Sequence, residues 1–160
     1  MAIHFDYGQS PLAGERLACQ KLSHHFGIDI RFGEIRPCIL PQNSQGYFGR
    51  NLLFLLSAIN YFQEKSGLVS LGIHTGTPFY DCSINFCNDV QVILNGYAGG
   101  RMLIDVPFVE FSKNQVIDYC IENDLPIELT FSCQIGPLVA CGSCFSCLHR
   151  QDYDERKRSM

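Results

Sequence analysis

The sequence predicts an α/β protein built around a parallel sheet, and two observations support this prediction. Short apolar segments of strand length alternate along the chain with longer segments of helical periodicity. Strands separated by crossover helices pair in parallel, and such sheets are covered by helices on both faces. Near the C-terminus, four cysteines at metal-site spacing predict a small metal-binding loop joined to this fold.

Length and composition favour one globular domain over residues 1–160. With 46% hydrophobic and 18% charged residues, the chain can bury a core without disulfides. A net charge of -4 argues against direct binding of nucleic acid or of an anionic membrane surface. Nine cysteines indicate a reducing compartment, and neither a signal peptide nor a long apolar run is apparent, so we expect a cytoplasmic protein.

The N-terminal quarter predicts a strand, a helix and a second strand. Residues 2–7 form the first strand candidate. Apolar residues then recur at roughly helical spacing over residues 12–26, and Gly27 is placed to cap that helix at its C-terminus. Residues 28–32 alternate in polarity as a strand does. Residues 36–48 contain two prolines and are expected to form a loop.

The middle of the chain repeats the alternation. Residues 51–66 are apolar on nearly every side, which predicts a buried helix too short to be a membrane span. A strand is expected over residues 68–74 and another over residues 102–107, with a helix over residues 83–97 between them. A strand, a helix and a strand in this order again predict parallel pairing.

The C-terminal part predicts two helices around the cysteine loop. The tetrapeptide at residues 112–115 has the form of a capping box and should open a helix. Residues 127–131 are compatible either with a last strand or with an extended lead into the cysteine loop. Residues 149–158 are polar and should form the terminal helix.

The cysteine loop spans residues 133–147, and its last three thiols are spaced C-x-x-C-x-x-C. Its four candidate ligands are Cys133, Cys141, Cys144 and Cys147. Ordinary buried cysteines and a redox pair with two bystanders are the competing interpretations, and an iron–sulfur cluster is the rival to zinc. Zinc is favoured because a closed tetrahedral site at the end of an α/β chain would hold the last helix in place. Gly142 suits the tight turn of a zinc knuckle.

Open α/β sheets bind ligands beyond the carboxyl ends of their strands, so three loops are candidate binding sites. The turn at residues 5–9 is a candidate, although its spacing alone favours a plain turn at the end of a strand. At residues 48–51, Arg50 could bind a phosphate or carboxylate beside free backbone N–H groups, or could be a solvated arginine. Residues 74–82 are rich in hydrogen-bonding groups and suit a substrate loop or a simple turn.

Four elements in this order resemble the 7-cyano-7-deazaguanine synthase family along essentially the whole chain. They are Phe-Asp-Tyr-Gly-Gln at residues 5–9, Gly-Arg-Asn at 49–51, Tyr-Asp-Cys at 80–82 and the cysteine loop at 133–147. The resemblance implies an adenine-nucleotide α-hydrolase-like fold of the ATP-pyrophosphatase group. It also implies ATP-dependent conversion of 7-carboxy-7-deazaguanine and ammonia to the nitrile preQ0, a queuosine precursor.

The same resemblance assigns expected binding residues. The four cysteines would hold Zn²⁺, and ATP with Mg²⁺ would bind where the family's phosphate loop is present. The residues expected to contact nucleotide or substrate are Asp6, Tyr7, Gly8, Gln9, Gly49, Arg50, Asn51, His74, Thr75, Tyr80, Asp81 and Cys82. No residue is assigned a catalytic role. A small 7-deazapurine is the expected ligand, with no direct nucleic acid or membrane partner.

Two departures from the family pattern accompany the resemblance. The family's phosphate loop, Ser-Gly-Gly-x-Asp-Ser, does not occur in these 160 residues, and the first strand here matches the family's second. We therefore expect an incomplete sheet, a homo-oligomer or complementing chain, and doubtful activity of this chain alone. The alternative is a purine-binding or regulatory relative that keeps the zinc site. In addition, Phe79, Tyr80 and Ser83 replace the family's tyrosine, proline and arginine around Asp-Cys.

Overall fold

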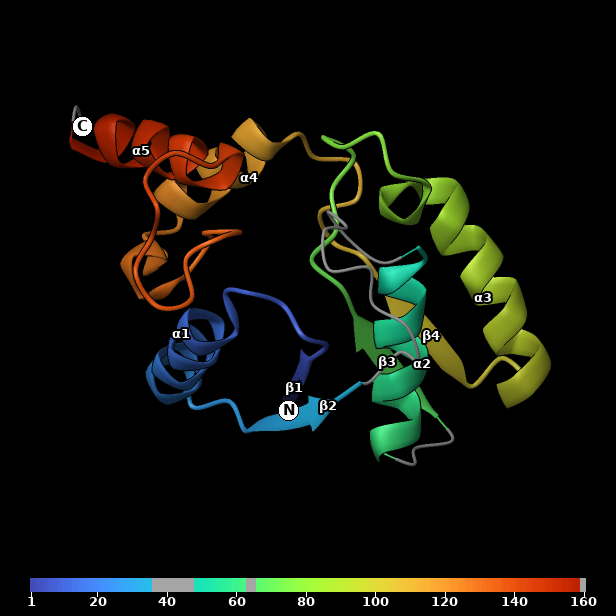
Figure 1. The fold of residues 1–160 in the computed structure, drawn as a ribbon. Coiled ribbons are helices and arrows are strands. Elements are labelled where there is room, and N and C mark those ends of the chain that lie inside the picture. The colour runs from blue at the N-terminus through green and yellow to red at the C-terminus, as the bar shows by residue number, and fades with distance from the viewer. Residues whose placement is uncertain (36–47, 63–65, 159–160) are drawn as a thin grey trace. The chain divides into compact units, whose positions relative to one another are not determined.

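A computed structural model describes residues 1–35, 48–62 and 66–158 of the chain (Figure 1). The expected loop at 36–48 lies outside the described residues except for Phe48. Residue contacts divide the chain into two compact units, the first made of Met1–Cys38 and Tyr119–Met160 and the second of Ile39–Asp118. The expectation of one domain over residues 1–160 stays a prediction.

The first unit begins with two parallel strands joined by a helix. β1 (Ala2–Asp6) pairs with β2 (Ile30–Glu34), and α1 (Leu12–Phe26) connects them. Gly27 caps α1 with φ 63°, as its position predicts. The second strand begins two residues later than expected because the N–H of Ile28 still bonds to the carbonyl of Ser23 at 3.0 Å.

The C-terminal part of the chain contains two α-helices, of which α4 (Lys113–Glu122) starts in the second unit and ends in the first. The other, α5 (Phe145–Arg158), is the terminal helix, four residues longer at its start than predicted. The expected capping box is present, since Ser112 Oγ accepts from the N–H of Gln115 at 3.3 Å and Gln115 Oε1 accepts from the N–H of Ser112 at 2.8 Å.

Of the two alternatives left open for residues 127–131, a last strand or an extended lead into the cysteine loop, the strand is absent from the described chain. Ile127–Leu129 instead form a short 3₁₀ helix, η2. Pro126 precedes it, the N–H of Leu129 bonds to the Pro126 carbonyl at 3.0 Å, and Thr130 Oγ1 donates to the Ile127 carbonyl at 2.6 Å. These local turn bonds use groups that a strand would need for pairing, so the chain enters the cysteine loop from a turn.

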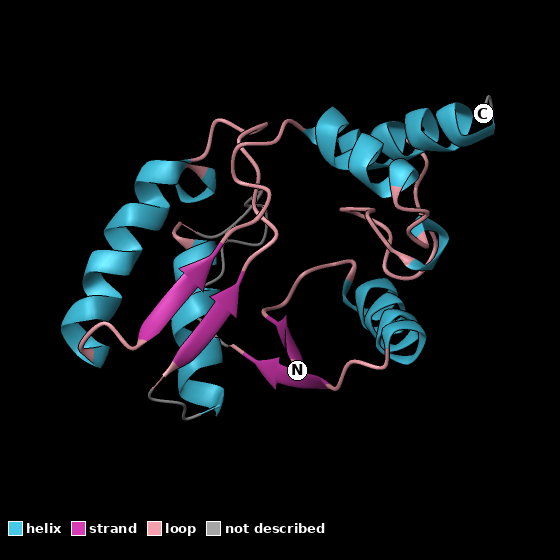
Figure 2. Cartoon of the chain, turned by 180° about the vertical axis from the view of Figure 1, so that it is seen from behind, coloured by secondary structure: helices cyan, strands magenta, loops and turns pink. Residues whose placement is uncertain are grey.

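The second unit contains a βαβ arrangement and an additional helix. β3 (Gly67–Ser70) pairs in parallel with β4 (Met102–Asp105), and α3 (Ile84–Ala98) lies between them in sequence. α2 (Arg50–Phe62) precedes the pair, and both helices lie along it in the two views (Figures 1 and 2). Between β3 and α3 the chain forms a 3₁₀ turn, η1 (Tyr80–Cys82).

The core of the second unit lies between these two helices and the strands. Its buried members are Leu55, Ile73, Phe86, Cys87, Val90, Leu94, Met102 and Val109. Leu55 of α2 is fully buried, which confirms that this apolar helix belongs to the core. On the strands, Leu68 and its partner Leu103 remain 63% and 48% exposed, so helices of this unit cover only one face of the pair.

The parallel α/β class is confirmed, and the sheet is divided. Within the described residues β1 pairs with β2 and β3 pairs with β4, giving two separate two-stranded sheets instead of one continuous sheet. Both pairs are parallel, as connection through a helix requires. Among the described helices, none is both long and apolar enough to cross a lipid bilayer.

Candidate functional site

The four cysteines of the loop converge at one point. The Sγ atoms of Cys133, Cys141, Cys144 and Cys147 all lie within 4.8 Å of one another. In a tetrahedral zinc–thiolate site with Zn–S bonds of about 2.3 Å, neighbouring sulfurs are about 3.8 Å apart. The Sγ atoms of Cys141 and Cys147 are 3.9 Å apart, so this pair already has the spacing that an ion requires. The sequence prediction of a four-thiol cluster is confirmed.

Backbone N–H groups point at the ligand sulfurs. Cys133 Sγ accepts from the N–H of Gly136 at 3.1 Å and of Ile135 at 3.5 Å. Cys141 Sγ accepts from the N–H of Cys144 at 3.3 Å and from Ser143 Oγ at 3.7 Å. These bonds stabilise negative charge on sulfur, and a thiolate is the form that binds a metal ion.

The surroundings separate the proton affinities of the thiols. The N–H groups of Cys141, Ile135 and Gly136 lower the pKa of Cys133. The N–H groups of Ser143 and Cys144, together with the Ser143 hydroxyl, lower the pKa of Cys141 to about 6. Burial and the neighbouring Cys144 raise the pKa of Cys147 to about 12. A cation therefore finds the thiolate form most readily at Cys141 and must displace the Cys147 proton to complete its shell.

Two glycines give the loop its shape. Gly142 has φ +75°, a conformation that side chains rarely adopt, directly after Cys141 as the knuckle prediction requires. A Cβ at Gly136 would collide with the carbonyl oxygen of Val139, so the close approach that aims the Gly136 N–H at Cys133 needs glycine.

The cysteine cluster is attached to two helices of its unit, α5 and α1. Cys147 lies in the first turn of α5, and Gln151 of the same helix donates to the Gly142 carbonyl at 3.3 Å. At the other side, the N–H of Gly14 in α1 bonds to the Pro137 carbonyl at 2.7 Å. Cys133, Cys144 and Cys147 are buried, while Cys141 is exposed. A metal ion here would cross-link α5 to the loop, which is a structural role.

A second group of predicted residues meets at the start of α2. The backbone N–H of Asn51 donates to Asp81 Oδ2 at 3.2 Å. The Asn51 side chain donates from Nδ2 to the Asp81 carbonyl at 2.8 Å and lies 3.6 Å from Cys82 Sγ. Asn51 is 6% exposed. Two motifs thirty residues apart in sequence are therefore joined by the amide of one buried side chain.

The N-terminus of α2, where a bound phosphate or carboxylate was expected, already has one carboxylate of the protein, that of Asp81. Asp81 occupies one of the free N–H groups of the first turn, where a negative charge is favoured. Gly49 precedes the helix with φ +67°, and its carbonyl accepts from the N–H of Leu53. The Arg50 guanidinium lies 6.0 Å from the centre of the Phe54 ring and has no carboxylate partner among the described residues. Arg50 thus keeps the capacity to bind an anionic group.

Tyr80 faces α3. Its hydroxyl donates to Asp89 Oδ2 in a short hydrogen bond, and its ring packs edge-on against Phe86 with centroids 5.8 Å apart. The bond to Asp89 raises the pKa of Tyr80. Ser83 caps α3 by accepting from the N–H of Phe86 at 3.2 Å. Ser83, at the position of the family's arginine, is therefore an N-cap.

His74 and Thr75 lie in the loop after β3. His74 Nδ1 accepts from the N–H of Gly76 at 3.1 Å, and Thr75 Oγ1 donates to the Phe111 carbonyl at 3.4 Å. Burial and the nearby Lys113 charge lower the pKa of His74. At neutral pH this histidine is neutral, and the Nδ1 bond leaves the proton on Nε2.

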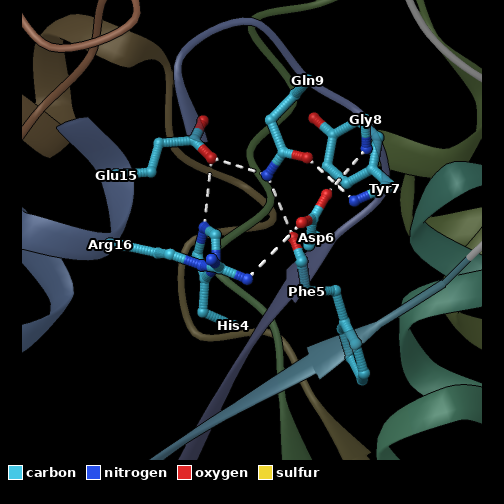
Figure 3. Close-up of polar contacts among 8 residues, drawn as sticks. All are labelled: His4, Phe5, Asp6, Tyr7, Gly8, Gln9, Glu15 and Arg16. Atoms are coloured by element: carbon cyan, nitrogen blue, oxygen red, sulfur yellow. Dashed lines mark hydrogen bonds and ion pairs between the residues drawn. The ribbon is translucent and has the colours of Figure 1, made fainter. Parts of the chain in front are cut away.

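The first predicted turn lies in the other unit and is closed by its own hydrogen bonds (Figure 3). Gln9 donates from Nε2 to the Phe5 carbonyl at 3.0 Å and to Glu15 Oε2 at 2.8 Å, and its Oε1 accepts from the N–H of Tyr7 at 2.9 Å. Asp6 accepts from the N–H of Gly8 at 3.0 Å and from Arg16 at 3.5 Å. These contacts give Asp6 and Gln9 a structural role in joining β1 to α1.

Sequence reasoning missed several partners of the predicted residues. Glu15 and Arg16 fix the first turn, Asp89 holds Tyr80, and Lys113 lies near His74. No local pattern distinguishes these side chains from other surface charges. The N–H donors to Cys133 were also missed, although Gly136 within the cysteine loop was an available signal.

Comparisons with known proteins identify the family of this chain. Residues 43–155 match the family model described as "Queuosine biosynthesis protein QueC". The 7-cyano-7-deazaguanine synthase of Prochlorococcus marinus subsp. pastoris is 30% identical over 113 residues, covering 64% of this chain and 50% of the relative. The protein of the same name from Campylobacter hominis is 28% identical, and the match covers 92% of this chain and 79% of the relative. The one from Aquifex aeolicus is 27% identical, and the match covers 94% of this chain and 83% of the relative. The chain belongs to the QueC family of queuosine biosynthesis proteins.

Proposed function

We propose that this chain takes part in the synthesis of 7-cyano-7-deazaguanine, the activity named for its relatives. In that reaction a carboxylate on a 7-deazaguanine is activated with ATP and combined with ammonia to give a nitrile. Activation is required because a carboxylate oxygen is a poor leaving group. The observation that supports the proposal is the joining of Gly-Arg-Asn to Asp-Cys through Asn51.

Arg50 is the residue proposed to bind the substrate carboxylate or a nucleotide phosphate. Its guanidinium lies at the start of α2 without a carboxylate partner in the described chain, and a planar guanidinium binds such groups through two hydrogen bonds. ATP and Mg²⁺ are assigned to a phosphate loop that these 160 residues do not contain. A complementing chain is the proposed source of that loop, and a second copy of this chain is the proposed partner in self-association.

Zinc is the metal proposed for the cysteine cluster. Four thiolates with a sulfur spacing close to a tetrahedron suit Zn²⁺, and a closed four-ligand shell leaves no position for substrate. The proposed role of the ion is to stabilise the loop and α5. We also propose a cytoplasmic location, where the free thiols remain reduced.

Calorimetric titration of the purified chain with 7-carboxy-7-deazaguanine tests the proposed function. Saturable binding is expected, with affinity reduced on the order of tenfold or more in Arg50→Ala, because a charged hydrogen-bonding pair is lost. Arg101→Ala is the matched control, since Arg101 is an exposed arginine of the same unit. Absence of saturable binding, or equal loss in both variants, would overturn the proposal.

The alternative function is that of a purine-binding or regulatory relative without turnover. It is favoured by the loss of arginine from the Asp-Cys element, where Ser83 now caps a helix. Binding of the deazapurine without ATP consumption, in the presence of a chain that supplies the phosphate loop, would select this alternative. ATP-dependent nitrile formation under the same conditions would select the synthase.

A further inference from the structure

The turn η1 contains two of the expected binding residues, and hydrogen bonds from the two neighbouring helices fix its position. Asp81 and Cys82 are half-buried, and η1 is only three residues long. Its internal bonds are limited, with the N–H of Cys82 bonded to the Phe79 carbonyl and the N–H of Ser83 to the Tyr80 carbonyl, both at 3.0 Å. A turn this short does not fix the direction of its side chains without outside contacts.

Those contacts come from both neighbouring helices. On the α3 side, the Tyr80 hydroxyl bonds to Asp89 and Ser83 Oγ donates to the Tyr80 carbonyl at 2.7 Å. Both of these contacts hold the first residue of the turn or its flank. On the α2 side, every hydrogen bond to Asp81 and Cys82 among the described residues comes from Asn51, through the main-chain N–H and the side-chain amide.

Asn51 is poorly placed to bind a ligand directly. Its side chain is buried with 6% exposure, and its Nδ2 group already serves the Asp81 carbonyl and the Cys82 sulfur. An amide nitrogen has two hydrogens, so both are used by these acceptors. We propose that Asn51 is a positioning residue, which holds η1 on the first turn of α2 so that Asp81 and Cys82 keep one orientation toward the substrate. The last part of this inference rests on the proposed function.

The consequence of losing Asn51 is local. Without the amide, the half-buried Asp81 carbonyl and the Cys82 sulfur lose their donor from α2, and on that side η1 keeps only the bond from the main-chain N–H of residue 51 to Asp81 Oδ2. The turn should then open more often, exposing Cys82, whereas the core around the 4% exposed Cys87 stays closed. A change that merely weakened the fold would expose both thiols together.

Alkylation of the two thiols therefore separates the alternatives. The zinc-loaded, ligand-free chain is treated with iodoacetamide at fixed pH, and modification of Cys82 and Cys87 is followed by peptide mass spectrometry. In Asn51→Leu, which keeps a similar volume without the amide, Cys82 should react on the order of tenfold faster while Cys87 is unchanged. Asn51→Ala should show the same selectivity if packing of the leucine disturbs the helix.

The matched control is Asn60→Ala in the same helix. Asn60 is exposed, and its amide donates to the Leu56 carbonyl at 2.7 Å within α2. This variant should leave both rates as in the unmodified sequence. Equal Cys82 rates in the Asn51 variants and the control, or a parallel rise at Cys87, would overturn the positioning role.

A final arm adds 7-carboxy-7-deazaguanine to the original chain. Protection of Cys82 that weakens in Asn51→Leu supports the full inference. Failure of the deazapurine to protect Cys82 in the original chain overturns its assignment to this turn, while selective exposure in Asn51→Leu would still establish that Asn51 holds η1. The positioning role and the proposed function are thus tested by different readings of one experiment.

Discussion

The backbone N–H of Cys141 donates a hydrogen bond to Cys133 Sγ over 3.3 Å, although the two residues are eight positions apart. This bond joins the isolated first cysteine of the loop to the C-x-x-C-x-x-C segment. The chain's own backbone therefore contributes to bringing the four sulfurs together. An ion entering the cluster would replace the direct contact between the Cys141 and Cys147 sulfurs by metal–sulfur bonds, and the backbone N–H bonds to sulfur could remain.

The purified protein should contain about one zinc ion per chain and be colourless. Elemental analysis and the visible spectrum measure this directly. Four thiolates within 4.8 Å suit a single tetrahedral ion. Brown protein containing iron and acid-labile sulfide would show that the cluster holds an iron–sulfur centre instead.

Cys144→Ser should lower the free energy of unfolding by several kcal/mol, because structural zinc contributes directly to folding. Chemical denaturation with simultaneous zinc analysis measures the change. Cys120→Ser is the control, since Cys120 is a half-buried cysteine of α4 outside the cluster. A similar loss in both variants, with zinc retained in Cys144→Ser, would contradict a structural zinc role for Cys144.

Asp89→Asn should bring the pKa of Tyr80 back toward its ordinary value, because the bond to the Asp89 carboxylate is the main cause of its rise. Protons bind more tightly to the folded state than to the unfolded state in this case. The stabilisation is thus fully present below about pH 10 and is lost as the pH rises through the folded pKa. Titration of ¹³C-labelled tyrosine by NMR measures the shift. An unchanged Tyr80 titration in Asp89→Asn would mean that the bond is not formed in solution.

The 160-residue polypeptide alone should not convert ATP to AMP and pyrophosphate. This chemistry depends on donors positioned around the phosphates, and the chain contains no Ser-Gly-Gly-x-Asp-Ser loop to provide them. Chromatographic detection of AMP after incubation with ATP, Mg²⁺, ammonia and 7-carboxy-7-deazaguanine tests the expectation. Turnover above that of a Cys133→Ser preparation would count against it.

The chain should associate with itself in solution. In the described residues each sheet has two strands, so β1 and β3 each have one edge without a strand partner. The exposed Leu68 and Leu103 add apolar surface on the β3–β4 pair. Light scattering should show a dimer or a larger species. A monomer with a high thermal midpoint would contradict this prediction.

The sequence by itself determined most of the helices and strands and the cysteine cluster. The C-terminal end of α1 was readable because Gly27 can adopt the left-handed conformation that stops a helix. The start of α4 was readable because Ser112 and Gln115 cap it reciprocally. The cysteine cluster was readable because ligand spacing is local: three of its four sulfurs come from seven consecutive residues. Parallel pairing followed from the helices between strands.

Only the tertiary structure decided which polar residues meet. Asn51 and Asp81 are thirty positions apart, and their contact depends on how α2 and η1 pack, which no local propensity encodes. The same packing placed the Asp81 carboxylate at the N-terminus of α2. The division of the strands into two pairs is likewise a property of long-range backbone hydrogen bonding, since an apolar strand pattern specifies burial but not the neighbour with which the strand pairs.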